Sequence, residues 1–247
     1  MENAESIQIY LDSRYAQKRD GNAGNAYFQI SNIYVEDGYH IHLGLVNLTM
    51  PYSFYNVNTS NNVLTWDYIG NPQQNFTVPV GNYTIHQLVQ YLNANWTGFT
   101  VYYNGITNKV TVSNSAQFTI YSSGFARLLG FTGNGYSTGA GPYTVGSQNC
   151  VNLYTITQIQ VETNLLTYNV SNTANKTNNR NILASIPVSC APFGLIVYEN
   201  PSQYKTNLYV GEFNYVEARL LDNNGNVIDM NGCDYCMTLQ LDIIPFR

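Results

Sequence analysis

Apolar and polar residues alternate along most of the first fifty residues, and this period of two is the pattern of half-buried β-strands. In the clearest example, Ile7, Ile9 and Leu11 fall on one face of an extended segment, and more polar residues fall on the other. A loop rich in Gly and charged residues separates this segment from the next. We therefore predict three strands in this region, at residues 6–13, 26–31 and 39–49.

The pattern changes after Pro51, and one of the segments that follow has apolar residues at helical spacing. Thr84, with Gln87 three residues later, has the sequence of a capping box at a helix N-terminus. The predicted helix has an apolar face that consists of Ile85, Leu88, Val89 and Leu92. Around this helix, the sequence predicts hairpins at residues 62–80 and 99–113, a short strand at 117–122 and a helical turn at 123–131.

The segment 133–146 is rich in Gly and shows no apolar periodicity, which is typical of a flexible surface loop. It contains no Lys or Arg, so it is a poor cradle for an anion. The functional alternative is a loop that contacts another molecule, with Tyr136 and Tyr143 as its anchor residues.

Strand-like alternation returns after Leu153 and predicts five further strands, at residues 154–166, 182–189, 193–200, 213–222 and 235–243. Eight antiparallel strands in two sheets make a single jelly roll, so the predicted fold class is all-β. We label the eight strands B to I. Residues 1–50 and 150–247 then form one discontinuous jelly-roll domain, and residues 51–149 form a small α+β module that is inserted in the D–E loop.

The stretch 220–244 contains two Asn-Gly pairs and a Cys-x-x-Cys formed by Cys233 and Cys236. Asn-Gly pairs supply the positive φ angles that tight turns require. In a strand, an odd separation sends two side chains to opposite faces, whereas a zinc or redox site needs two converging sulfurs. We therefore interpret these residues as ordinary thiols in a closing strand. A zinc knuckle completed by Cys150 and Cys190 is the alternative.

His40 and His42 lie two residues apart in a predicted strand, and this spacing resembles the start of the metal motif of cupins, which are also jelly rolls. No Glu follows at short spacing, and the only other His is His86, on the predicted helix. Spacing alone supplies no third ligand, so we predict no metal and no other cofactor. The sequence also lacks a nucleophile elbow and a phosphate loop, and we predict that the protein is not an enzyme.

Composition describes the surface that such a fold would present. Of 247 residues only 10% are charged, whereas 14% are aromatic, led by 22 Tyr. Tyr is common in strands and at protein contacts, so both roles remain open. The net charge of -5, without clustered Lys and Arg, argues against direct binding of nucleic acid. No apolar run has the length of a membrane span and no signal peptide is present, so we expect synthesis inside a cell.

Two parts of the sequence resemble viral structural proteins. The segments NILASIPV, PFGLIVYEN and FNYVEARLLDNNGNVIDMNG resemble the penton, or minor capsid, proteins of virophages, polinton-like viruses and related large DNA viruses. The segments VPVGNYTIHQLVQYLN, FTVYYNGITNKVTVS and FTIYSSGFARLLGF resemble a β-α-β module of proteins of that kind. The chain departs from this family at Tyr235, where other members tend to have Trp, and in its Cys-x-x-Cys.

The resemblance implies a capsid protein with a single upright jelly roll. Five copies would form a ring at the five-fold vertices of an icosahedral shell, held by double-jelly-roll trimers of a major capsid protein. The protein would be assembled inside the host cell and located in the virion, and its inserted module would project outward, toward a possible host receptor or glycan.

Two alternatives to the capsid role remain. One is a carbohydrate- or receptor-binding jelly-roll module, such as a fibre tip, in which Tyr side chains and Trp66 or Trp96 stack on sugar rings. The other is a cupin-like metalloenzyme that uses His40 and His42.

Overall fold

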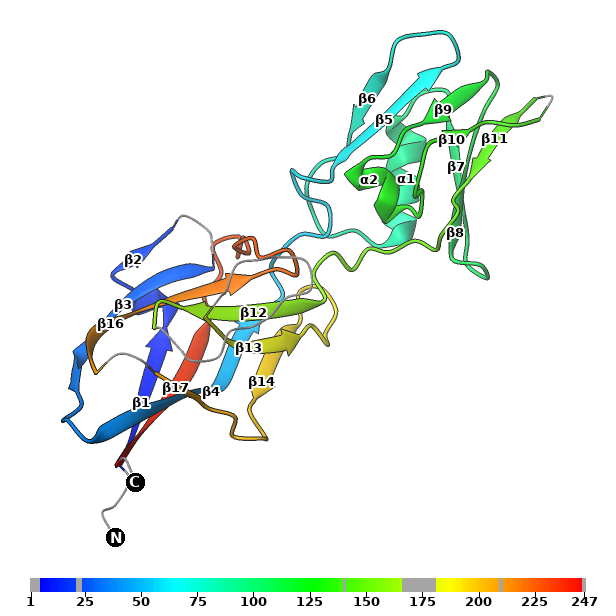
Figure 1. Ribbon diagram of the computed structural model, residues 1–247. Helices are drawn as coiled ribbons and strands as arrows, with labels where there is room; N and C mark the ends of the chain where they lie inside the picture. The colour runs from blue at the N-terminus through cyan, green and yellow to red at the C-terminus, as the bar shows by residue number, and fades with distance from the viewer. Residues whose placement is uncertain (1–4, 21–23, 140, 166–180, 209–210, 246–247) are drawn as a thin grey trace. The chain divides into compact units, whose positions relative to one another are not determined.

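The computed structural model describes residues 5–20, 24–139, 141–165, 181–208 and 211–245. Within these residues the chain consists mainly of antiparallel β-strands. It divides into two compact units (Figure 1). Unit 1 comprises Met1–Phe54 and Ile156–Arg247, and unit 2 comprises Tyr55–Thr155.

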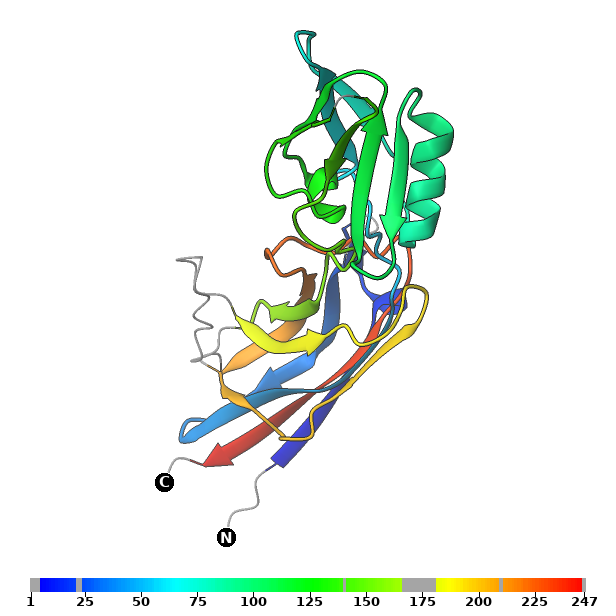
Figure 2. The ribbon, with the colours of Figure 1, turned by 90° about the vertical axis from the view of Figure 1, so that its right-hand side faces the viewer.

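Unit 1 contains two antiparallel sheets that lie face to face (Figure 2). The first has the strand order β1-β17-β4-β14, and the short strand β15 also pairs with β4. Its strands are β1 (Glu5–Asp12), β4 (Tyr39–Pro51), β14 (Leu195–Glu199), β15 (Thr206–Asn207) and β17 (Cys236–Pro245).

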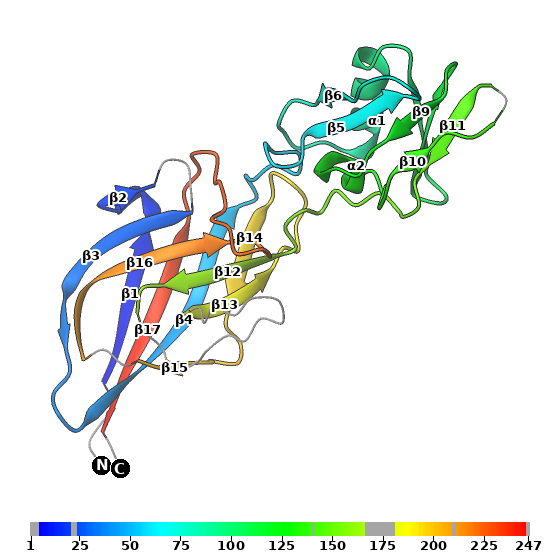
Figure 3. The same cartoon turned by 45° about the horizontal axis from the view of Figure 1, so that its top comes forward.

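The second sheet of unit 1 has the order β13-β12-β16-β3-β2, and Figure 3 shows it crossing in front of the first. Its strands are β2 (Lys18–Arg19), β3 (Asn25–Tyr34), β12 (Gln158–Thr163), β13 (Ile182–Pro187) and β16 (Glu212–Leu221).

This strand order is that of a jelly roll. The predicted strands B to I correspond, in chain order, to β1, β3, β4, β12, β13, β14, β16 and β17. One sheet therefore reads B-I-D-G and the other reads C-H-E-F, with β2 added at its edge. The prediction of an all-β single jelly roll is confirmed. All of unit 2 lies between strands D and E in the sequence.

The core of unit 1 lies between the two sheets, because alternate residues of each strand point toward the opposite sheet. Ile9 and Leu11 of β1 are buried and Ile7 is partly buried, as the alternation in the sequence predicts. The same core contains buried side chains from both sheets, among them Leu43, Leu45, Val161, Val216, Leu220 and Leu239.

Unit 2 contains two further antiparallel sheets and two helices. One sheet has the order β10-β9-β5-β6 and the other has the order β11-β8-β7. Figure 2 shows the first helix alongside the β7–β8 pair. The elements are β5 (Val63–Tyr68), β6 (Gln74–Thr77), α1 (Ile85–Asn95), β7 (Thr100–Asn104), β8 (Lys109–Asn114), β9 (Phe118–Ile120), α2 (Gly124–Leu128), β10 (Gly135–Tyr136) and β11 (Tyr143–Gly146).

Helix α1 begins where the sequence predicts. The Gln87 backbone N–H donates to Thr84 Oγ1, and the Thr84 backbone N–H donates to Gln87 Oε1 at 2.8 Å, so the capping box is present. Leu88 and Leu92 are buried, which confirms the predicted apolar face. Neither described helix is long and apolar enough to cross a membrane.

Aromatic side chains form much of the core of unit 2. The rings of Trp96 and Phe99 stack with their centroids 3.9 Å apart, and Trp66 contacts Phe99 edge-on at 4.7 Å. Trp66 and Trp96 are only 7% and 3% exposed. The suggestion that these two tryptophans stack on sugar rings is therefore wrong, because both are used to fill the core.

The Gly-rich segment 133–146 is more ordered than its sequence predicts. Its first part forms β10, which pairs with β9, and its last part forms β11, which pairs with β8. The prediction of a loop without strands is wrong at both positions, because the partners of these strands are supplied by distant parts of unit 2. Residue 140 lies outside the described residues.

Candidate functional site

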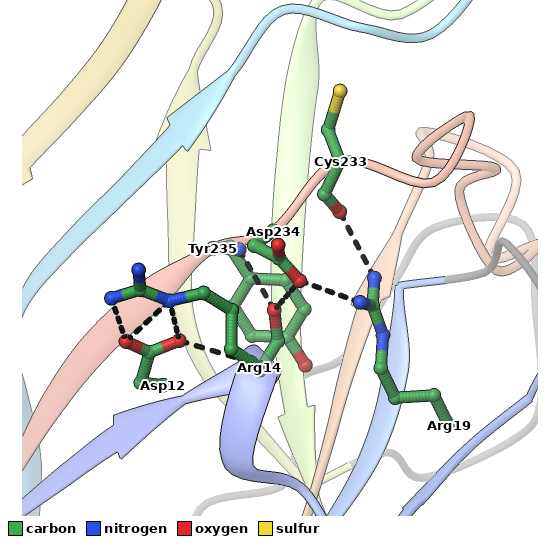
Figure 4. Close-up of polar contacts among 7 residues, drawn as sticks. Asp12, Arg14, Arg19, Cys233, Asp234 and Tyr235 are labelled. Atoms are coloured by element: carbon green, nitrogen blue, oxygen red, sulfur yellow. Dashed lines mark hydrogen bonds and ion pairs between the residues drawn. The ribbon is translucent and has the colours of Figure 1, made fainter.

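A polar network fastens two turns at one end of unit 1 (Figure 4). The buried Ser13, which follows strand B, donates from Oγ to Asp234 and accepts from the backbone N–H of Tyr235, both at 3.0 Å. Arg19 donates to the same Asp234 carboxylate and, at 3.0 Å, to the carbonyl of Cys233. The B–C turn is thus joined to the H–I turn by side chains from both.

The pKa values of the ionisable groups around this network indicate a structural role. The hydrogen bonds from Arg14 hold the pKa of Asp12 down to about 2, so this carboxylate stays charged. Burial raises the pKa of the Tyr235 phenol well above its usual range, so the ring stays neutral. Neither shift produces a group that titrates near neutral pH, as a general acid or base would.

Hydrogen bonds also join the H–I turn to the D–E segment, and the D–E segment to the F–G turn. Asn231 Nδ2 donates to the carbonyl of Ser53, just before the chain enters unit 2. The backbone N–H of Tyr52 donates to the Gly194 carbonyl at 2.8 Å, and the N–H of Phe193 donates to the Tyr52 carbonyl at 3.1 Å. The segment that leads into unit 2 is therefore hydrogen-bonded to the turns on both of its sides.

Next to this end, an edge strand displays apolar side chains. Phe193, Leu195 and Val197 are 81%, 58% and 57% exposed, whereas Ile196 between them is buried. We call these three exposed residues the β14 strip. Phe193 has a φ of +68°, which is strained for a bulky side chain. Apolar edge strands are templates for pairing with another chain, so the β14 strip is a candidate contact surface.

The opposite edge of the same sheet is also aromatic. Tyr10 on β1 is 75% exposed, and Tyr15 in the following turn is 80% exposed. β1 and β14 are the two outer strands of the B-I-D-G sheet. Exposed apolar or aromatic side chains therefore lie at both edges of this sheet.

The C-H-E-F sheet carries a compact charge cluster. Arg219 on β16 donates from Nε to Glu217 at 2.9 Å and lies 3.3 Å from a carboxylate oxygen of Glu162 on β12. The two carboxylate side chains are only 12% and 13% exposed, and the Arg219 side chain is 39% exposed. One guanidinium therefore compensates two largely buried negative charges.

Replacing Arg219 with Met should destabilise unit 1, because it leaves the Glu162 and Glu217 carboxylates close together without a cation. We expect the free energy of unfolding to fall by about 2 kcal/mol, less than for a fully buried pair because Arg219 is partly hydrated. Urea unfolding followed by circular dichroism measures this. The exposed ion pair of Arg14 with Asp12 gives the matched control: a similar loss in Arg14→Met would contradict the role of burial.

The Cys residues do not form a site. Asn231 and Gly232 have φ of +50° and +79°, which confirms the tight turn that the sequence predicts before Cys233. Cys236 begins β17 and is exposed, and all four Cys of the chain are free thiols. Partial desolvation of the sulfur and then the Asp12 charge raise the pKa of the Cys236 thiol, although the residue as a whole is exposed, and this makes it a poor nucleophile.

The two predicted His candidates lie together on β4. The ring centroids of His40 and His42 are 4.9 Å apart, and burial and then the His40 charge lower the pKa of His42. Asp242 pairs with His42 across the sheet, but its carboxylate forms an ion pair with Lys205. The described part of the chain contains no cluster of three or more His, Cys, Asp or Glu side chains able to hold a metal. Nothing in this arrangement favours the cupin-like alternative.

The other predicted site residues lie on outer strands of the two sheets of unit 2. Tyr136 on β10 is 64% exposed. Tyr143 on β11 is half-buried and packs against the core. Contact with another molecule through these two residues stays a prediction.

Comparison with known proteins identifies the architecture. No protein-family model matches the sequence, and no curated sequence matches it. Among solved structures, the mavirus penton protein matches 97% of this chain and 100% of its own, with 10% sequence identity and a TM-score of 0.58. This chain has the fold of a penton protein. A chain from the structure of the Sputnik virophage aligns over 97% of the residues of this protein and 98% of its own residues, with 13% identity and a TM-score of 0.45.

Two proteins can share this fold at such low sequence identity because the fold places only general requirements on the sequence. A jelly roll needs alternating apolar positions and turns of the right length, and many sequences supply them. Fold alone does not fix function, so the role of this penton fold has to be argued from its surfaces.

Proposed function

We propose that this protein is a structural capsid protein that forms homopentameric pentons at the five-fold vertices of an icosahedral virion. The observation that carries the proposal is the match in fold to the mavirus penton protein, which spans 97% of this chain and thus includes both units. The jelly roll would sit among trimers of the major capsid protein. No catalytic function is proposed.

The contact surfaces of unit 1 support assembly into a ring. The β14 strip lies at one edge of the B-I-D-G sheet, and Tyr10 and Tyr15 lie at the other. In a closed ring each copy uses two different surfaces, so the β14 strip of one copy would meet the tyrosines of the next. Aromatic and apolar side chains are favoured at the centre of such interfaces.

We also propose that the two units are separate domains, with unit 2 inserted in the jelly roll and projecting outward from the shell. Each unit has its own hydrophobic core. Two hydrogen bonds of the D–E segment support this, because they fix the point where the chain leaves the jelly roll: Ser53 O accepts from Asn231, and the Tyr52 N–H donates to the Gly194 carbonyl.

Electron microscopy and sedimentation of the purified full-length protein test the ring. We expect five-fold rings, formed by the protein alone or on mixing with the major capsid protein. A protein that stays monomeric in both conditions, or capsid particles that assemble without it at their vertices, would overturn the proposal.

A further inference from the structure

A groove of about 380 Å³ runs along the exposed face of α1 in unit 2. This volume falls in the range of about 300–1,000 Å³ that is typical of small-molecule sites. Two aromatic rings, those of Tyr83 and Tyr91, line the groove, and the small side chain of Ala94 leaves space beside them. No Asp, Glu, Lys or Arg lines it.

Both tyrosine rings are held in place by their surroundings. Tyr83 Oη donates to the carbonyl of Pro79 at 2.9 Å, and a Cβ at Gly81 would lie only 3.2 Å from the Tyr83 ring. Tyr91 packs on Phe76, with ring centroids 6.2 Å apart. Burial and then the proximity of Tyr91 raise the pKa of Tyr83, so its phenol stays neutral. Rings that are ordered before binding cost little entropy when a ligand packs on them.

Primary amides supply the polar part of the groove, from Asn82, Gln87, Gln90 and Asn95. The side-chain amide of Gln90 makes no hydrogen bond to any residue that the structure describes. Asn95 uses Nδ2 to donate to the Tyr91 carbonyl at 2.8 Å, and Gln87 uses Oε1 in the helix cap. Asn82 is already engaged, because its Oδ1 accepts from the Asn56 backbone N–H at 2.9 Å. Primary amides carry both donor and acceptor atoms, so Gln90, Nε2 of Gln87 and Oδ1 of Asn95 present groups of both kinds beside the two rings.

We propose that this groove binds an uncharged oligosaccharide. Sugar hydroxyls donate and accept hydrogen bonds, which matches primary amides, and the C–H face of a sugar ring packs against an aromatic ring. An acidic glycan would find no cation here to offset its desolvation. The proposal does not depend on the ring of jelly rolls, because every lining residue belongs to α1 or to the segment before it.

The test uses the full-length protein on an array of neutral, sialylated and sulfated oligosaccharides, followed by titration of the best neutral ligand. Ala94→Arg fills the groove from an exposed helical position and should lower the apparent affinity at least about tenfold. Ile106→Arg adds the same side chain at a residue that is 97% exposed in the β7–β8 turn, and should leave binding unchanged. All three proteins are compared in the same oligomeric state, since several copies raise the avidity.

The proposal is overturned if no neutral oligosaccharide binds, if acidic glycans are preferred, or if Ala94→Arg binds as well as the unmodified protein. An equal loss in Ile106→Arg would also contradict it, because the effect would then come from added charge. Electron microscopy of Ala94→Arg should show the same assembly as the unmodified protein. Failure of glycan binding is thereby separated from failure of the penton role.

Discussion

Replacing Gly130 with Ala should unfold unit 2 selectively. Gly130 has a φ of +91°, and an added Cβ would lie 2.2 Å from the carbonyl oxygen of Asn149. The backbone has little room to move, because the Gly130 carbonyl accepts from the Asn149 N–H at 2.9 Å. Left-handed strain and a clash with backbone act together, so we expect the free energy of unfolding of unit 2 to fall by at least about 3 kcal/mol.

The tryptophans of the chain report on unit 2 alone. Trp66 and Trp96 are the only two, and both are buried in its core, so their fluorescence follows its unfolding in denaturant. Gly133→Ala is the matched control, because an added Cβ at that position meets no atom within 4 Å. Hydrogen exchange of β4 and β17 amides should stay unchanged in Gly130→Ala. Equal loss of their protection would contradict the proposal of two separate domains.

The jelly roll could be predicted because its strands carry their own evidence. In a half-buried strand the period of two decides which face is apolar, as Ile9 and Leu11 show, and turn residues mark where each strand ends. The capping box at Thr84 locates α1 in the same local way. β10 and β11 could not be found, because two to four residues in a Gly-rich segment have no period and become strands only through distant partners.

The candidate contact surfaces were harder to predict, since exposure is a tertiary property. The run from Phe193 to Val197 is continuously apolar apart from Gly194, a pattern that also fits a fully buried strand. Leu195 lies on the face of the strand opposite to the buried Ile196 and therefore stays in solvent. The opposite error occurred for Trp66 and Trp96, whose type suggested sugar stacking although their neighbours bury them. Tyr83 and Tyr91 line a groove only because the segment before α1 places Tyr83 beside the helix that carries Tyr91.

Aspartate at two positions of the β14 strip should prevent ring formation and leave each copy folded. Leu195 and Val197 are more than half exposed in the single copy, so Leu195→Asp with Val197→Asp should cost unit 1 only about 1 kcal/mol. In a ring interface each change removes about 1.5–3 kcal/mol of apolar burial and adds an unpaired charge. We expect at least about a hundredfold weaker association at each interface, measured by sedimentation.

Two further variants decide what covers the β14 strip. Val227→Asp makes the same kind of change at an apolar residue of unit 1 that is 40% exposed and lies outside the strip, so its rings should persist. Tyr10→Asp changes the opposite edge and should disrupt the ring as strongly as the strip variant does, because a head-to-tail interface needs both surfaces. If the strip variant disrupts the rings and Tyr10→Asp leaves them intact, the strip meets another part of the neighbouring copy. Rings that tolerate Asp at both positions would mean that a different capsid protein covers the strip, since side chains this exposed add little to the stability of the isolated chain.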